Sequence, residues 1–431
     1  MGVTRRRFSR RKFLELATAA AAGAAMSWDC AAAMPAGPKA RVIIVGGGFA
    51  GASCALHLRS ANPALEVTLV DPDDRYITCP MSNSVLVGLR ALGSITVSRD
   101  ALERRGVTLA RDRVEAIDAQ RRQVRLGRGA TLAYDRLVMA PGIRFLWGQP
   151  QGYDEAAARV MPHAWQAGAQ TEILAAQLRG IRSGGVVAIS VPAGPMRCPP
   201  GPFERAGLMA DFLKRRNPRA KILIFDANNH FPKQDLFTDA WQALYPGMID
   251  WIPVVRDGAV VRVAPAEMTI YTSHDAHRAD VINIIPPQAP ALLAVEAGLA
   301  SGHGWCPIDP QTFESTLIPY VHVIGDACIA DPMPKAASSA NAQARQCALA
   351  ILAALEERPS SAPILESVCY SLLAPDRALS IHGRFQAADG RMLQLPAAAE
   401  PEPAAGEEEA RNAADWFQRI VADSFGRWLP G

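Results

Sequence analysis

Long hydrophobic runs and a surplus of charge of either sign are both missing from this sequence of 431 residues. Charged residues make up 20% of it and the formal net charge is only +3, with no basic cluster of the kind that binds nucleic acid. Beyond the N-terminal region, no segment has the length and continuity of a transmembrane helix. We therefore expect no nucleic-acid partner and no membrane span. The 49% hydrophobic composition suffices for two or three globular domains.

Ligand sets for haem and for metal ions are missing as well. The eight cysteines include no Cys-x-x-Cys-His haem motif and no pair of Cys-x-x-Cys motifs of the zinc-binding kind. The histidines show no spacing that is typical of metal ligands. The sequence thus predicts no metal site, and any haem that works with this chain must belong to a partner subunit.

The first 38 residues read as a signal peptide. The segment SRRKFL at 9–14 matches the twin-arginine export pattern, and the apolar stretch at 14–25 is too short to span a bilayer. Residues 1–38 contain six basic residues and two carboxylates and so have a net charge of +4. Because the whole chain has a formal net charge of +3, the remaining residues have a net charge near −1. We expect a periplasmic protein exported in the folded state, where disulfides are permitted. A basic amphipathic helix is the alternative for this segment.

A dinucleotide-binding unit follows. Arg41–Val45 is predicted to be a buried strand, residues 49–62 a helix and Glu66–Val70 the next strand, with the loop GGGFAG after the first strand. Strand, glycine loop, helix, strand and acid in this order form the context in which the motif binds a dinucleotide. An ordinary glycine-rich turn is the alternative.

Each residue of the loop has an expected part. Gly46 makes the turn, Gly48 admits the pyrophosphate, and Gly51 lets the helix pack on the strand. Asp71 follows the second strand and would bind the ribose hydroxyl groups. The cofactor contacts predicted here are Gly46, Gly48, Phe49, Ala50, Gly51 and Asp71.

Two later segments fit the same unit. Residues 134–142 (YDRLVMAPG) are predicted to be a strand that ends in a tight turn, and residues 321–326 (VHVIGD) a strand that ends in Gly-Asp. A Gly-Asp turn means little alone, but here it is the third match in the expected order. The further cofactor contacts that we predict are Val114, Ala140, Pro141, Gly142, Gly325 and Asp326.

A second nucleotide-binding unit is altered in its loop. Strands at 184–190 and Lys221–Asp226 flank a helix near 204–216. The loop before this helix is rich in proline, which removes N–H donors and fixes φ. A nicotinamide dinucleotide is therefore not expected there, and the loop offers the thiol of Cys198 instead. The prolines are Pro192, Pro195, Pro199, Pro200 and Pro202.

An ordered set of short motifs covers nearly all of residues 39–431. The set resembles the flavoprotein chain of flavocytochrome c sulfide dehydrogenase, and RCPPGP is not shared with nicotinamide-dependent relatives. The motifs are GGGFAG, YITCPMSN, APG, PHAW, RCPPGPFERA, DVINIIPPQ, GWCPID, TFEST, HVIGDACIADPMPK, CYSLLAP and WFQRIVADSFG.

The resemblance implies an α/β fold with two doubly wound Rossmann-like domains of the glutathione-reductase type and a C-terminal α+β domain. Residues 396–409 read as a flexible linker and residues 415–426 as a helix. The expected parts are a signal peptide at 1–38, an FAD-binding domain at 39–155 and 286–356, a degenerate NAD-type domain at 156–285, and a flavocytochrome-type domain at 357–431.

The resemblance also implies the chemistry. In that family the cysteine that matches Cys79 is joined to FAD by a thioether, and those that match Cys198 and Cys369 form a redox disulfide beside the flavin. Spacing alone would not pair them. Hydrosulfide would attack this disulfide, sulfane sulfur would result, and the electrons would pass through FAD, without NAD(P), to a c-type cytochrome subunit in a heterodimer. A buried free thiol at Cys79 and a purely structural disulfide are the alternatives.

Three further residues match family positions near the flavin. Glu204 would manage protons beside the disulfide if burial raises its pKa. Lys335, with the helix that starts near residue 337, would place positive charge beside the flavin, and Trp416 would lie near the ring. The ordinary alternatives are a solvated acid at a helix start, a surface lysine and an aromatic in the core. The other cysteines, Cys54, Cys306, Cys328 and Cys347, are expected to be buried.

Two other functions stay open from the sequence. One is a non-enzymatic accessory flavoprotein of a sulfur-oxidising complex. The other is a sulfide:quinone oxidoreductase, which would share the fold and the disulfide but bind the membrane surface through apolar C-terminal residues. These residues are Trp416, Phe417, Ile420, Val421, Phe425 and Trp428.

Overall fold

The computed structural model describes residues 40–300, 304–396 and 405–427. The expected signal peptide, Trp428 and most of the expected linker lie outside these ranges. Within them, no helix is long and apolar enough to cross a membrane. The same ranges contain no group of His, Cys, Asp or Glu side chains that could hold a metal ion.

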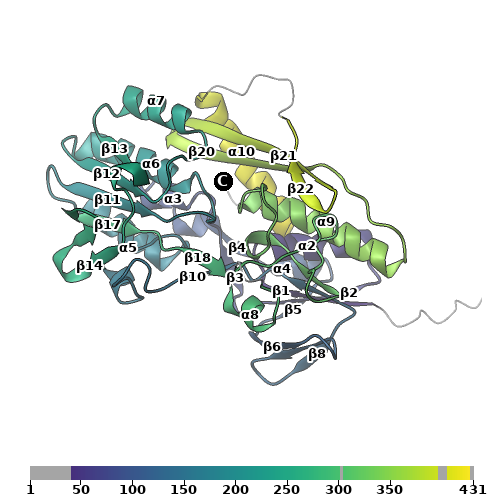
Figure 1. Cartoon of the computed structure of the whole chain (residues 1–431). Coiled ribbons are helices and arrows are strands. Elements are labelled where there is room, and N and C mark those ends of the chain that lie inside the picture. Colours follow the sequence, from purple (N-terminus) through teal and green to yellow (C-terminus); the bar gives the residue numbers. More distant parts are fainter. Residues whose placement is uncertain (1–39, 301–303, 397–404, 428–431) are drawn as a thin grey trace, which may run out of the picture. The chain divides into compact units, whose positions relative to one another are not determined.

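A five-stranded parallel sheet forms around the first predicted strand (Figure 1). Helices α2 (Phe49–Ala61) and α9 (Ala337–Leu355) pack against each other beside it. The chain leaves this sheet after β9 and returns to it at β19, so two distant segments build one sheet. The strand order is β19 (Val321–Val323), β9 (Arg136–Met139), β1 (Arg41–Val45), β2 (Glu66–Val70) and β5 (Thr108–Ala110).

A four-stranded parallel sheet forms the second unit. Helix α6 (Gly201–Arg216) packs against three of its strands, and α5 (Ala169–Arg179) and α7 (Gln234–Leu244) lie beside it. The predicted order of strand, helix and strand is confirmed, with α6 starting three residues before Glu204. The strand order is β13 (Ile249–Ile252), β12 (Lys221–Asp226), β11 (Val186–Val191) and β17 (Val281–Ile284).

Short elements connect these sheets. The antiparallel groups are β3 (Arg75–Ile77) with β4 (Thr96–Ser98), β10 (Ile143–Phe145) with β18 (Gln288–Pro290), β6 (Val114–Asp118) with β7 (Gln123–Leu126) and β8 (Thr131–Ala133), and β14 (Arg262–Ala264) with β15 (Thr269–Tyr271) and β16 (Ala276–Arg278). The short helices are α3 (Ser82–Leu86), α4 (Asp100–Arg104) and α8 (Leu292–Glu296). The 3₁₀ turns are η1 (Leu92–Ile95), η2 (Ala157–Arg159), η3 (Val254–Arg256), η4 (Pro265–Glu267) and η5 (Gly325–Ala327).

The C-terminal segment joins the two parallel-sheet units. Strand β20 contacts α6 of the second unit and α9 of the first, and Figure 1 shows β20 and β21 running between these helices. Phe385 and Phe417 belong to the hydrophobic core of the first sheet, whereas Leu372 and Leu379 belong to the core of the second. The elements are β20 (Leu365–Ala374), β21 (Arg377–Ala388), β22 (Arg391–Gln394) and α10 (Glu407–Phe425).

Helix α10 starts earlier than the composition indicates. Residues 407–409 were expected in the linker, but these three glutamates form the first turn of the helix. Negative side chains are favoured there because the helix dipole is positive at its N-terminus. The linker prediction is therefore wrong for residues 407–409.

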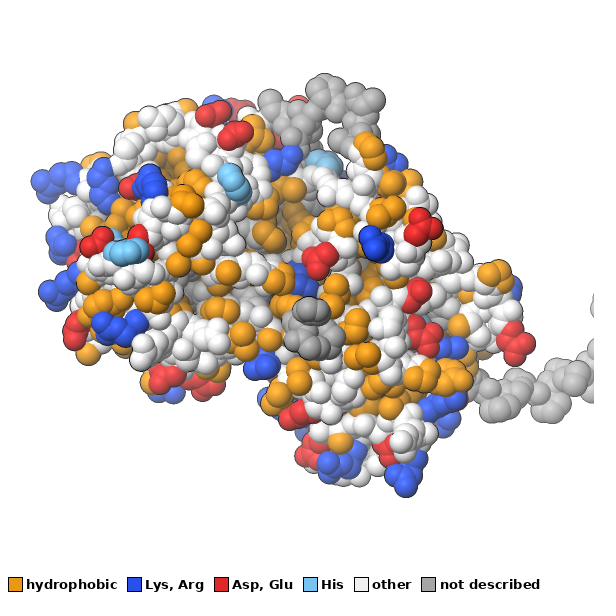
Figure 2. Space-filling view, in the orientation of Figure 1, with side chains coloured by type: hydrophobic (Ala, Val, Ile, Leu, Met, Phe, Trp, Pro, Cys, Tyr) orange, Lys and Arg blue, Asp and Glu red, His pale blue; other side chains and the backbone are white. Residues whose placement is uncertain are grey.

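Two parallel sheets with helices against them and a C-terminal region of antiparallel strands and a helix confirm the predicted α/β class. On the face drawn in Figure 2, acidic and basic side chains are interspersed among hydrophobic ones.

Candidate active site

One large cavity brings together side chains from both sheets and from the C-terminal segment. Its volume is about 1010 Å³, at the upper end of the range for cofactor and small-molecule sites. The first unit contributes residues 46–50, 140–142, Gly325 and Asp326. The second contributes Arg197, Cys198, Glu204 and Arg205, and the C-terminal segment contributes Cys369, Tyr370, Leu372 and Trp416.

The glycine loop is shaped for close approach of a ligand to the backbone. Gly46 has a φ of +98°, and a Cβ on it would lie 2.3 Å from the carbonyl oxygen of Ala140. A Cβ on Gly51 would lie 1.9 Å from the carbonyl oxygen of Gly46. Helix α2 starts directly behind this loop, and its N-cap, Gly48, has no side chain to cap the first N–H groups. This arrangement fits the pyrophosphate of FAD, which binds backbone N–H groups at a helix N-terminus.

Asp71 faces this loop together with an arginine that the sequence analysis missed. The Oδ2 atom of Asp71 accepts a hydrogen bond from the N–H of Gly47 at 2.7 Å. Arg99 Nη2 lies 3.1 Å from the same oxygen, and its Nε donates to the carbonyl of Gly47 at 3.2 Å. The side chain of Arg99 is only 3% exposed. Nothing in the local sequence marks Arg99, because it reaches the loop through the turn after β4.

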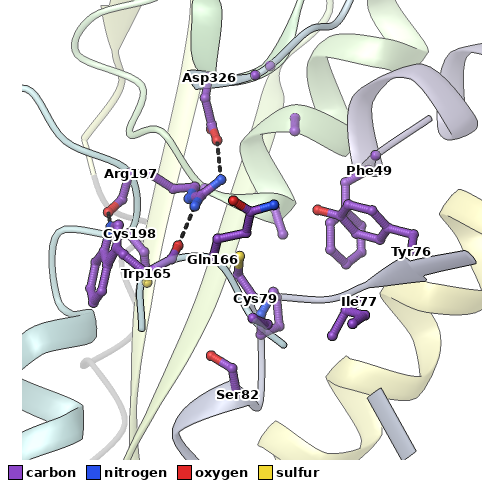
Figure 3. Close-up of a pocket in the computed structure, with 18 of the residues that line it drawn as sticks. Phe49, Tyr76, Ile77, Cys79, Ser82, Trp165, Gln166, Arg197, Cys198 and Asp326 are labelled. Atoms are coloured by element: carbon purple, nitrogen blue, oxygen red, sulfur yellow. Dashed lines mark hydrogen bonds and ion pairs between the residues drawn. The ribbon is translucent and has the colours of Figure 1, made fainter. Parts of the chain in front are cut away.

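A second arginine lies at the centre of the cavity. Arg197 Nη1 is 3.9 Å from Asp326 Oδ2, and its Nη2 donates to the carbonyl of Trp165. Figure 3 shows Arg197 reaching from the loop of Cys198 towards Asp326. Burial raises the pKa of Asp326, and Arg197 opposes that rise. No local sequence pattern marks this cation either.

Three of the predicted cofactor contacts are not among the residues that line the cavity. Gly51 lies beneath the glycine loop, and Val114 is in strand β6. Lys335 Nζ donates to the carbonyls of Asp326 at 2.9 Å and Cys328 at 2.8 Å and faces the ring of Trp305. Its positive charge is thus directed at backbone oxygens rather than at the cavity. The start of α9, in contrast, does line the cavity with residues 337 and 340.

Three cysteines line the cavity, each from a different part of the fold. Cys79 follows strand β3, Cys198 precedes helix α6, and Cys369 lies on strand β20. All cysteines in the described ranges are free thiols, so the disulfide between Cys198 and Cys369 stays a prediction. Burial, then Glu204 and Cys369, raise the pKa of the Cys198 thiol, which places both groups in its surroundings. The other four cysteines are buried, as expected.

Serine side chains hold the thiol of Cys369. Ser338 Oγ lies 3.1 Å from Cys369 Sγ and 2.8 Å from Ser367 Oγ. Burial raises the pKa of Cys369, and the hydrogen bonds of the two serines oppose that rise. The thiol therefore lies beside the hydroxyl groups of two serines.

The start of α6 is built around Cys198. A Cβ on Gly201 would lie 2.8 Å from Cη2 of Trp165 and 3.0 Å from Cys198 Sγ. Cys198 itself has a left-handed φ of +54°, and its N–H donates to the carbonyl of Lys335 at 2.8 Å. Where a nucleotide loop would present N–H groups to a pyrophosphate, this loop places the sulfur atom of Cys198 and the indole ring of Trp165 close to Gly201.

Glu204 lies inside the cavity rather than in solvent. Asn83 Nδ2 donates to its Oε2 at 2.9 Å, and the N–H of Leu372 donates to its Oε1 at 3.2 Å. Burial raises the pKa of Glu204, and these two hydrogen bonds oppose the rise. The alternative of a solvated acid at a helix start does not describe this side chain.

Helix α10 closes the cavity with Trp416, whose ring centroid is 5.8 Å from that of Tyr370. The apolar residues next to it point into the protein. Phe417, Val421 and Phe425 are 0% exposed and Ile420 is 7% exposed.

Comparison with known proteins matches three segments of the chain to family models. Residues 171–286 match the central region of the sulfide dehydrogenase [flavocytochrome c] flavoprotein chain. Residues 361–425 match the flavin-binding region of flavocytochrome c sulphide dehydrogenase. Residues 40–160 match the pyridine nucleotide-disulphide oxidoreductases.

Individual relatives agree with these matches. Over 45 residues the chain is 56% identical to the sulfide dehydrogenase [flavocytochrome c] flavoprotein chain of Chlorobaculum thiosulfatiphilum, a match over 10% of this chain and 94% of that sequence. It is 22% identical to the mitochondrial sulfide:quinone oxidoreductase of Mus musculus, over 70% of this chain and 68% of the mouse protein. The fold is similar to that of the sulfide:quinone oxidoreductase from Aquifex aeolicus, with a TM-score of 0.72 and 18% identity over 91% of this chain and 93% of that one.

Proposed function

The chain belongs to the family of flavocytochrome c sulfide dehydrogenase flavoprotein chains, and from this premise we propose that it oxidises sulfide to sulfane sulfur in the periplasm and passes the electrons to a c-type cytochrome subunit. At the coarser level, the chain is an FAD-dependent oxidoreductase of the sulfide dehydrogenase type.

The observation that carries the proposal is the meeting of three thiols in one cavity with a glycine loop. Cys79, Cys198 and Cys369 come from positions far apart in the sequence, yet all line the cavity that starts at residues 46–50. A cofactor held at the glycine loop and extended into this cavity would share the cavity with the three thiols.

We propose that Cys198 and Cys369 form a disulfide in the resting enzyme. The sulfur of hydrosulfide bonds to one of the two Sγ atoms, the S–S bond breaks, and the other cysteine leaves as a thiolate. The product is a persulfide on one cysteine, so the substrate sulfur is oxidised and the disulfide is reduced. Ser338 donates a hydrogen bond to Cys369 Sγ in this scheme and so stabilises a negative charge on that atom.

FAD, when bound, would supply the chemistry that takes up an electron pair and releases the electrons singly. The residues that would hold it are the glycine loop, Asp71, the turn at Gly325 and Asp326, and the start of α9. We propose that Cys79 holds it by a covalent bond, since this thiol lies in the cavity directly after strand β3.

The proline-rich loop supports the absence of NAD(P) from the reaction. Its prolines lack N–H donors, and the side chains of Cys198 and Trp165 crowd Gly201 at the start of α6. A cytochrome partner is proposed from the family, whose name includes the cytochrome.

A sulfide:quinone oxidoreductase is the second candidate, since such enzymes share the fold. The residues that would bind the membrane surface argue against it. Phe417, Ile420, Val421 and Phe425 are buried in the protein core, and Trp416 lines the cavity.

The test is reduction of the flavin under anaerobic conditions. Sulfide should bleach the flavin absorbance of the purified protein, NADH should not, and dithionite should bleach it as a control. Addition of sulfide to the chain together with its cytochrome partner should reduce the haem, whereas a quinone should not serve as acceptor. Bleaching by NADH, or turnover with quinone alone, would contradict the proposal.

A further inference from the structure

A buried arginine follows Glu204 directly in the sequence. Arg205 is 2% exposed, and its guanidinium stands over the ring of Trp165 with 5.0 Å between them. It donates to carbonyl and amide oxygens, which are neutral. These are Asn83 Oδ1 at 3.0 Å, Asn283 Oδ1 at 2.7 Å and the carbonyls of His163 at 3.1 Å and Ala164 at 2.6 Å. A charge held in the interior requires an opposite charge nearby or dense hydrogen bonding.

Asn83 connects this arginine to Glu204. Its Oδ1 accepts from Arg205 Nε, and because arginine has only donors, the oxygen of the amide must face the arginine. The amide nitrogen is then turned the other way, where it donates to Glu204 Oε2 at 2.9 Å and to the carbonyl of Gly201 at 3.2 Å. Asn83 is 7% exposed and lies on the short helix α3, which begins after the left-handed Met81.

We propose that Asn83 is a positioning residue for Glu204: its amide, oriented by Arg205, holds the carboxyl group against the cavity sulfurs and couples that group to the positive charge of the arginine. The inference rests on the proposed function and deepens it, because it assigns the control of the site's proton-transfer group. The groups around the carboxyl are Arg205 on α6, the thiol of Cys198 before α6, the thiol of Cys369 on β20, the N–H of Leu372 on β20 and the amide of Asn83 on α3.

The arrangement gives the carboxyl group two opposing influences. Burial favours the protonated form, whereas both N–H donors and the charge of Arg205 favour the ionised form. In the sulfide step, the persulfide S–H can then give its proton to the ionised Glu204, which leaves a persulfide anion and a neutral carboxylic acid. Loss of the Asn83 donor removes part of what keeps the carboxylate ready to accept that proton.

The experiment is an infrared titration of the full-length protein with its flavin bound. The band of the protonated carboxylic acid of Glu204 is identified by its loss in Glu204→Gln. Asn83→Leu keeps the side-chain size but removes the donor, so the titration of this band should move to higher pH. Asn83→Asp keeps an oxygen for Arg205 and places a second carboxyl group beside Glu204, so it should also move the titration of this band to higher pH. This variant replaces the leucine variant if the latter does not fold.

Asn341→Leu is the matched control. Asn341 is also hydrogen-bonded, to Ser53 and Ser424, but it is not among the residues that line the cavity. In this control, the Glu204 band should titrate at the same pH as in the wild type. An unchanged titration in both Asn83 variants, with only a lower melting temperature, would make Asn83 a structural residue and overturn the inference.

The titration needs no sulfide, so it separates this inference from the proposed function. Failure of sulfide to bleach the wild-type flavin would refute the function and leave the infrared result standing. If sulfide does bleach it, the pH dependence of the bleaching rate in Asn83→Leu should shift to higher pH together with the band. A pH profile that stays in place would count against the inference.

Discussion

Arg197 Nη1 lies 3.9 Å from Asp326 Oδ2, and the two residues come from loops that follow strands of different sheets, β11 and β19. Their contact is a point at which the two parallel-sheet units meet inside the cavity. The same contact places a positive charge in the cavity, because the guanidinium of Arg197 lines it while the ammonium of Lys335 is held by the carbonyls of Asp326 and Cys328.

Removal of this charge should make the bound flavin harder to reduce. Arg197→Gln should lower the flavin midpoint potential by about 30 mV, which for a two-electron couple corresponds to about 1.4 kcal/mol, because a nearby cation stabilises the added negative charge. Spectroelectrochemical titration measures it. Lys335→Gln is the comparison and should have the smaller effect; the reverse order would show that Lys335 supplies the charge after all.

Cys79→Ser should release the flavin. If the thioether is present, acid precipitation of the wild type leaves a yellow pellet, whereas the variant leaves a yellow supernatant. Mass spectrometry of the peptide that contains Cys79 should show the added mass of the flavin. A colourless wild-type pellet would refute the covalent bond without affecting the rest of the site.

Cys198→Ser and Cys369→Ser should each abolish bleaching of the flavin by sulfide and keep both the flavin and the fold. A purely structural disulfide would behave in the opposite way, since closure of a loop of about 170 residues stabilises by about 5 kcal/mol in the chain-entropy model. Anaerobic stopped-flow spectroscopy and a melting curve decide between them. Cys306→Ala is the control, because Cys306 is buried and is not among the residues that line the cavity. Sulfide should still bleach the flavin of this variant.

Gly51→Ala should disrupt the glycine loop. The new Cβ would lie 1.9 Å from the carbonyl oxygen of Gly46, so the loop must shift, at a cost of about 1–3 kcal/mol or more, and flavin should be lost. Flavin content and melting temperature of the purified protein report both effects. At Gly93 a Cβ meets nothing within 4 Å, and Gly93→Ala should therefore behave like the wild type; equal loss in both variants would argue against the steric explanation.

His163 should make the protein less stable in acid. Burial first, then Arg205 and Arg197, lower the pKa of His163 to about 3, and its Nδ1 accepts a hydrogen bond from the N–H of Trp165 at 3.0 Å. A lowered pKa contributes stability above the ordinary value of 6.5 that is lost as the pH falls towards the folded-state value.

The measurement is the melting temperature from pH 7 to pH 4. His163→Asn offers Oδ1 to the N–H of Trp165 and cannot be protonated, so its melting temperature should fall less steeply than that of the wild type. His382 is exposed, and His382→Asn should follow the wild-type curve. Parallel curves for all three proteins would show that His163 does not control the acid sensitivity.

The parts of the site that lie on one strand and its following turn could be predicted from the sequence. The loop at 46–51, Asp71 and the Gly325–Asp326 turn were located because strand, glycine and acid follow each other within a few residues. The structure places the loop residues 46–50, Asp71 and the turn along one cavity. The resemblance to a known family was needed to connect Cys79, Cys198 and Cys369, since no local pattern links them.

The residues that were missed act through long-range packing. Asn83 and Glu204 are 121 positions apart, and Arg99 reaches Gly47 across 52 positions. Arg197 adjoins a residue that was predicted, but the direction of its side chain is set by Asp326 and Trp165, which belong to other elements. For Lys335 the position in the sequence was informative, but the direction in which its side chain points could not be predicted from it.

The attachment of β20 to both α6 and α9 has a consequence for the order in which the protein is made. The glycine loop and Cys79 leave the ribosome first, whereas Cys369 and Trp416, which form the last wall of the cavity, leave near the end. Until then the surface that binds the flavin lacks that wall. A chain that ends before residue 365 would lack this wall and the thiol of Cys369, and we expect it to hold the flavin less tightly than the full chain does.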